Sequence, residues 1–82
     1  MGIELSLMSR SYCHLCHDME VALQPLLEEF SASLTVLDVD TDPALEAKYD
    51  ELVPVLLHGD YELCHYFLDA EKVRAYLGKP QS

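Results

Sequence analysis

The sequence is poor in positive charge. Its 82 residues include only 5 lysines and arginines against 15 aspartates and glutamates, which gives a formal net charge of −10. Proteins that bind nucleic acid or an anionic membrane surface need clustered positive charge to contact phosphate groups. We therefore expect neither nucleic acid nor a membrane as a partner. Self-repulsion at this charge also favours a monomer.

The chain also lacks a long hydrophobic run. No apolar stretch approaches the roughly 18 residues that predict a membrane span. The opening segment MGIELSLMSR is too short and too acidic for a secretory signal peptide. We therefore expect a cytoplasmic protein, in a compartment that keeps thiols reduced. The length predicts one domain over residues 1–78, followed by a flexible tail at 79–82.

Cysteine is scarce, and its three copies are an odd number, which argues against a disulfide-stapled scaffold. Cys13 and Cys16 nevertheless form a C-x-x-C pair in the segment RSYCHLCHDM. This pattern allows a thiol–disulfide redox pair, a haem attachment site (C-x-x-C-H) or half of a zinc site. Haem attachment requires that the protein be exported. Zinc requires four ligands, and although Cys64 and His65 could supply the second pair, the chain has no second C-x-x-C motif. The redox pair is favoured, and we expect no metal and no bound cofactor.

Hydrophobic periodicity divides the chain into strands and helices. The pattern predicts strands at residues 3–9, 34–39, 54–58 and 61–67, and helices at 15–30, from 43 to about 51, and 70–77. Asp42 and Asp69 are the expected N-caps of the last two helices, and Pro25 is expected to kink or restart the first. The order β-α-β-α-β-β-α predicts an α/β fold, with a four-stranded mixed sheet and helices on both faces.

The cysteine pair falls where the first strand gives way to the first helix. A helix N-terminus presents free N–H groups and a positive dipole end, which favour a thiolate. Cys13 is the candidate attacking thiol, and Cys16, one turn later, is the candidate buried thiol that resolves a mixed disulfide. His14 either adds partial positive charge there or is a solvated residue. Cys64 is expected to be a buried structural thiol.

Two segments resemble a known family. SRSYCHLC matches the glutaredoxin pattern of a serine, a basic residue, two further residues and C-x-x-C, and LVPVLL matches its Thr-Val-Pro segment. The chain thus resembles the glutaredoxin/thioredoxin superfamily, most closely the small bacterial glutaredoxin-like proteins. The resemblance implies a thioredoxin-like fold and thiol–disulfide oxidoreductase activity. It assigns Arg10 as the basic residue, Pro54 as a cis-proline, and Val53 as the residue whose backbone pairs with the substrate.

The sequence departs from this family where glutathione is held. Glutaredoxins carry a Gly-Gly pair after the last strand, whereas this chain reads LCHYFLDAEK, in which Asp69 alone resembles the acidic helix start. We therefore expect little dependence on glutathione. The expected partners are a protein or small-molecule disulfide and an external thiol reductant. Tyr12 is expected to shield the cysteine pair or pack against it, and the acidic run at 38–40 to be solvated surface.

A second interpretation comes from a different class of function. The same fold can serve as a redox-responsive or purely structural binding module without turnover, because a fold does not establish an activity.

Overall fold

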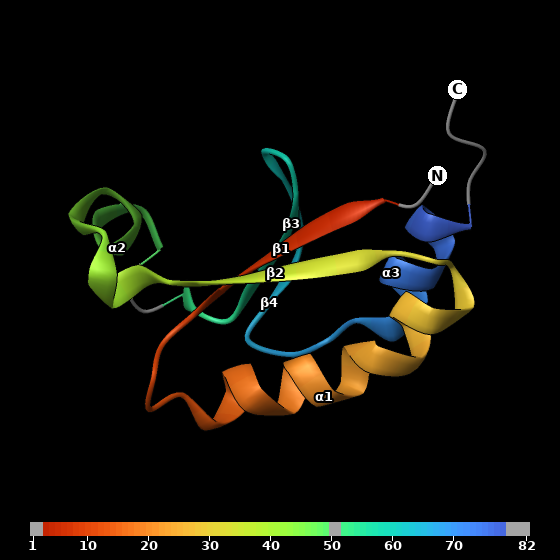
Figure 1. Cartoon of the computed structure of the whole chain (residues 1–82), viewed down its shortest axis with the longest axis horizontal. Coiled ribbons are helices and arrows are strands. Elements are labelled where there is room, and N and C mark those ends of the chain that lie inside the picture. Colours follow the sequence, from red (N-terminus) through yellow and green to blue (C-terminus); the bar gives the residue numbers. More distant parts are fainter. Residues whose placement is uncertain (1–2, 50–51, 79–82) are drawn as a thin grey trace.

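The computed structural model describes residues 3–49 and 52–78. The elements are, in chain order, β1 (Glu4–Ser9), α1 (His14–Glu29), β2 (Ser33–Asp38), the 3-10 helix η1 (Val39–Thr41), α2 (Pro43–Tyr49), β3 (Val55–His58), β4 (Tyr61–His65) and α3 (Ala70–Leu77). The predicted order β-α-β-α-β-β-α is confirmed (Figure 1). In that view α1 runs along the sheet, and α2 and α3 lie at opposite ends of the molecule.

The four strands form one mixed sheet in the order β2-β1-β3-β4. β1 and β2 are parallel, with Leu5 opposite Leu34 and Leu7 opposite Val36. β3 runs antiparallel to both of its neighbours. The mixed α/β sheet predicted from the segment order is therefore correct.

Side chains alternate along the strands and divide the core into two clusters, one on each face of the sheet. The first cluster packs strand residues such as Leu7 and Leu56 against α1 and α3. The second contains Met8, Cys16, Val39, Val53, Val55 and Leu57, with Leu45 and Tyr49 of α2 packed against it. Helices therefore cover both faces, and the second cluster is the one that receives the cysteine pair.

Pro25 does not restart the first helix, because α1 continues through this residue as one element. A proline removes the hydrogen bond to the carbonyl four residues earlier, here that of Val21. Val21 and Pro25 both lie on the exposed side of α1. Water can therefore satisfy the Val21 carbonyl, and the helix tolerates the proline.

β4 ends at His65, two residues before the predicted end. Tyr66 has a positive φ of 66°, and the Phe67 N–H donates to the His65 carbonyl at 2.8 Å, which closes a tight turn. The pairing of β3 with β4 also shifts register between Leu56 and Leu57. This irregularity directs the consecutive residues Leu63 and Cys64 into the same core cluster.

The two predicted aspartate caps are present. The Asp42 carboxylate accepts a hydrogen bond from the Ala44 N–H, and that of Asp69 accepts one from the Lys72 N–H at 3.0 Å. α2 is described only to Tyr49, so its predicted end near residue 51 lies outside the described residues, as does the tail at 79–82. In the described part of the chain, none of the helices is long and apolar enough to cross a membrane.

Candidate functional site

The cysteine pair lies at the start of α1. Cys13 is the N-cap residue, with an extended backbone, and Cys16 lies in the first turn of the helix. Their Cα atoms are 5.1 Å apart, and the two sulfur atoms are joined in a disulfide. The Cys16 N–H donates a hydrogen bond of 3.0 Å to the Cys13 Sγ. Cys13 therefore occupies the position at which a helix N-terminus stabilises negative charge on sulfur.

The two cysteines differ in exposure. Cys16 is only 2% exposed and belongs to the second core cluster, whereas Cys13 is half-buried at the margin of that cluster. A molecule in solution therefore reaches Cys13 more readily than Cys16.

The Val53–Pro54 segment, far from the cysteines in the sequence, packs close to the cysteine pair. Its peptide bond is cis, and Pro54 is fully buried. Val53 belongs to the same buried cluster as Cys16, and Cys13 packs against that cluster. The fold thus brings together the two motifs that carried the family resemblance.

Arg10 lies in the loop before the pair and is engaged by an acidic residue of η1. Its Nε atom lies 3.1 Å from the Asp40 Oδ1. The neighbouring Ser11 hydroxyl donates to the Asp38 carboxylate at 3.0 Å, and this carboxylate also accepts the Asp40 N–H. The acidic run at 38–40, expected to be only solvated surface, therefore fixes the loop that precedes Cys13. The sequence carries no local pattern that reveals a contact spanning these two segments.

Tyr12 and His14 flank Cys13 and point into solvent. Tyr12 is 99% exposed, so the expectation that it shields or packs against the cysteines is wrong for this structure. His14 is the first residue of α1 and is also exposed.

Cys64 is not part of this site. It is buried in the first core cluster, on the face of the sheet opposite the cluster that contains Cys16, as expected for a structural thiol. Burial raises the pKa of the Cys64 thiol above its ordinary value of 9.0. Across residues 3–49 and 52–78, no group of three or more His, Cys, Asp or Glu residues is arranged to hold a metal ion.

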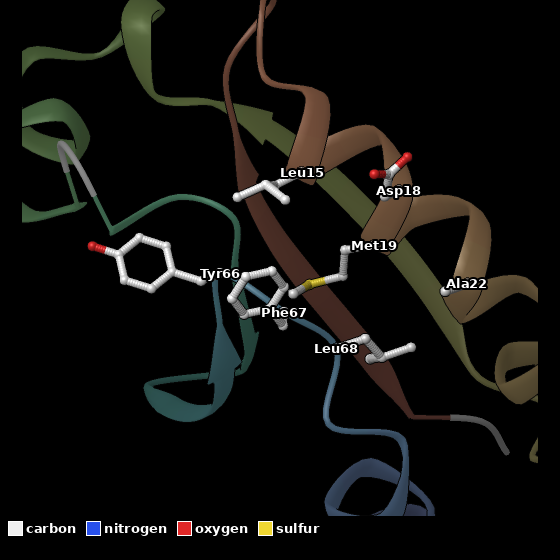
Figure 2. Close-up of a pocket in the computed structure, with 7 residues that line it drawn as sticks. All are labelled: Leu15, Asp18, Met19, Ala22, Tyr66, Phe67 and Leu68. Atoms are coloured by element: carbon white, nitrogen blue, oxygen red, sulfur yellow. The ribbon is translucent and has the colours of Figure 1, made fainter.

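An apolar groove lies next to the pair, between α1 and the loop that joins β4 to α3 (Figure 2). We call it the aromatic groove. Its lining residues are Leu15, Asp18, Met19 and Ala22 of α1 and Tyr66, Phe67 and Leu68 of the loop. Figure 2 shows Met19 reaching from α1 toward Phe67, which is 70% exposed. From the sequence, Tyr66 and Phe67 fall in the segment where glutaredoxins carry a Gly-Gly pair, but a groove was not predicted there.

A family model matches most of the chain: the Glutaredoxin-like domain (DUF836) is matched over residues 4–78. No curated protein gives a significant match.

Solved structures are similar over nearly the full length. The solution NMR structure of protein Ne2328 from Nitrosomonas europaea is 38% identical, with a TM-score of 0.84 and coverage of 95% of this chain and 94% of that one. The X-ray structure of a protein from X. campestris is 35% identical, with a TM-score of 0.68 and coverage of 93% and 99%. Thioredoxin 1 from Thermosipho africanus is 19% identical, with a TM-score of 0.61 and coverage of 92% and 94%, a likeness of fold alone.

Proposed function

Because the chain belongs to the glutaredoxin-like domain family (DUF836), we propose that it is a thiol–disulfide oxidoreductase in which Cys13 attacks and Cys16 resolves. The observation that supports this most strongly is the placement of the pair. Cys13 caps a helix with its sulfur accepting an N–H bond, and buried Cys16 lies within disulfide reach.

The proposed exchange moves two electrons between sulfur atoms. The Cys13 thiolate attacks one sulfur of the substrate disulfide, a mixed disulfide forms, and the other substrate sulfur leaves with the electron pair. The Cys16 thiolate then attacks the Cys13 Sγ, which breaks the mixed disulfide and forms the Cys13–Cys16 bond. Each released thiolate takes a proton from water. An external thiol reductant returns the pair to its reduced form, so the cycle needs no bound cofactor.

The buried Val53–Pro54 segment supports a substrate-binding role beside the pair. A substrate segment that adds to the backbone of Val53 as an extra strand would present its sulfur to Cys13, since Val53 and the pair share one cluster. Exposed Tyr12 and His14 flank the same approach.

Glutathione is a poor fit to this site. The carboxylates of a bound glutathione would compete with Asp40 for Arg10. Tyr66 and Phe67 also lie in the region where glutaredoxins carry a Gly-Gly pair, and only glycine permits close backbone approach without a Cβ clash. We therefore propose that a thiol donor of the thioredoxin type reduces the Cys13–Cys16 disulfide. We also propose that the chain works as a cytoplasmic monomer.

A trapping experiment separates this function from that of a dedicated binding module. The variant Cys16→Ser cannot resolve the mixed disulfide, so an oxidoreductase should accumulate several different proteins bonded through Cys13 in a cell lysate. A binding module should yield one partner or none. The double variant Cys13→Ser/Cys16→Ser is the matched control. Adducts that persist in this control, through Cys64, would contradict the assignment of Cys13.

A further inference from the structure

Resting on the proposed exchange reaction, the geometry points to the aromatic groove as the binding site for an apolar side chain of a polypeptide substrate, close to that substrate's cysteine. The groove has a volume of about 310 Å³. This is at the lower end of the range for ligand pockets, about 300–1,000 Å³, and suits one or two side chains rather than a large cofactor.

The position of the groove requires an occupant that extends along the helix. Leu15 lies between the two cysteines in the chain, and Ala22 lies about 10 Å further along α1, at a rise of 1.5 Å per residue. A molecule bonded to Cys13 that also fills the groove is therefore about three extended residues long. A polypeptide meets this requirement, with its cysteine at Cys13 and an apolar neighbour in the groove.

The backbone turn at Tyr66 positions the exposed ring of Phe67 beside the groove. Tyr66 holds a left-handed φ of 66°, a conformation that non-glycine residues adopt only at a cost in free energy. Its N–H donates to the Pro54 carbonyl at 2.9 Å, which ties the turn to the segment beside the cysteines. Figure 2 shows that Phe67 is the ring that faces Met19 of α1, whereas the Tyr66 ring points away from α1. The Tyr66 ring contacts the His65 ring instead, with 4.9 Å between centroids. The turn thus leaves the exposed Phe67 ring available to a bound side chain.

The charge at the groove indicates which kind of polypeptide binds there. Asp18 is the only charged residue that lines the groove within the described part of the chain, and the whole chain carries −10. A carboxylate beside an apolar floor, in a chain of negative net charge, favours a segment with a lysine or arginine beside its apolar residue. The same charge opposes a second copy of this chain as the occupant.

The test uses short synthetic peptides, each with one cysteine in a mixed disulfide with the coloured thiol thionitrobenzoate. Cys13 attacks the peptide sulfur, thionitrobenzoate leaves with the electron pair, and Cys16 then displaces the peptide thiolate. Release of the coloured thiol from excess peptide by the reduced full chain gives a second-order rate constant. Each peptide carries either Phe or Ala next to the cysteine, and both the preceding and the following position are tested. The residue after that Phe or Ala, counted away from the cysteine, is either Lys or Glu.

We expect the Phe peptide to react about tenfold to a hundredfold faster than the Ala peptide, because a buried aromatic ring leaves water. Phe67→Ala should reduce this preference to about twofold or less. Val21→Ala removes an exposed apolar side chain of α1 outside the groove and should leave the preference intact. The Lys peptide should react faster than the Glu peptide at low salt, and Asp18→Asn should lessen that difference.

Tyr66→Gly is a second control. The Tyr66 ring points away from α1 and glycine suits this φ, so the variant should fold and keep the preference for Phe. A preference that survives Phe67→Ala would overturn the assignment. So would a concentration-dependent dimer in sedimentation that Phe67→Ala converts to a monomer, because a second copy would then fill the groove.

The outcomes distinguish this inference from the proposed function on which it rests. Equal reaction of the Phe and Ala peptides would show an active oxidoreductase without a specific groove. Failure to release thionitrobenzoate through Cys13 from any peptide would contradict the oxidoreductase assignment itself.

Discussion

The Cys16 N–H donates a hydrogen bond of 3.0 Å to the Cys13 sulfur, across the first turn of α1. A sulfur that accepts a helix N-terminal N–H is better stabilised as a thiolate than as a thiol. The same bond therefore prepares Cys13 for attack in the reduced chain and keeps Cys16 within reach of it afterwards.

This relationship predicts an order of thiol reactivity. In the reduced chain near neutral pH, Cys13 should react with iodoacetamide faster than Cys16 or Cys64, because it combines exposure with a favoured thiolate. The measurement is the alkylation rate of each cysteine by peptide mass spectrometry over a range of pH. Faster modification of Cys64 than of Cys13 under native conditions would contradict the site.

Burial of Cys64 predicts a pH dependence of stability. Because the folded-state pKa of this thiol is raised above its ordinary value of 9.0, the stability that it contributes is fully present below pH 9. That contribution is lost as pH rises through the raised value, since ionisation then favours the unfolded chain. Denaturant unfolding of the oxidised chain, in which Cys13 and Cys16 do not titrate, should show the loss above pH 9.

The variant Cys64→Ala is the control for this pH dependence. It has a lower free energy of unfolding throughout, because a cavity replaces the thiol, but should fall less steeply with pH above 9. Identical slopes for the two chains would show that Cys64 titrates alike in the folded and unfolded states.

The Arg10–Asp40 ion pair predicts a variant with improved use of glutathione. Asp40→Asn removes one carboxylate that competes for Arg10, so kcat/KM for a glutathionylated peptide should rise about twofold to fivefold, the scale of an exposed ion pair. Glu46→Gln makes the same change in net charge at an exposed position of α2 and serves as the matched control. An equal gain in both variants would assign the effect to net charge alone.

The Asp69 cap predicts a loss of stability that a conservative replacement restores. Asp69→Ala should lower the free energy of unfolding by about 0.5–2 kcal/mol, because the Lys72 N–H then loses its acceptor at the start of α3. Asp69→Asn keeps an acceptor and should retain most of the stability. Denaturant unfolding of the three chains provides the comparison, and equal stabilities would mean that the cap contributes nothing.

Much of this fold could be predicted from local patterns. Strand alternation, the helical stripe of α1 and the Asp42 and Asp69 caps depend on neighbouring residues, so the sequence displays them directly. The position of Cys13 at the start of α1 followed from the same patterns. The role of Val53 and Pro54 came from the family resemblance, because local periodicity does not show which distant segment meets the pair.

The remaining features depend on contacts between segments or on backbone conformation. The Arg10–Asp40 pair joins a loop to η1, and the exposed setting of Tyr12 depends on where that loop turns. The left-handed turn at Tyr66 contradicts the usual preference of an aromatic residue, so propensity extends β4 two residues too far. The tolerance of α1 for Pro25 depends on the solvent exposure of its outer side.

The central claim is that the cysteine pair turns over as an oxidoreductase. Its most direct test is multiple-turnover reduction of a disulfide peptide by the full chain with a dithiol reductant, corrected for the uncatalysed rate. The account predicts many equivalents reduced per chain, activity lost in Cys13→Ser, and activity retained in Cys64→Ser. Reduction that stops at one equivalent per chain, or that persists in Cys13→Ser, would contradict it.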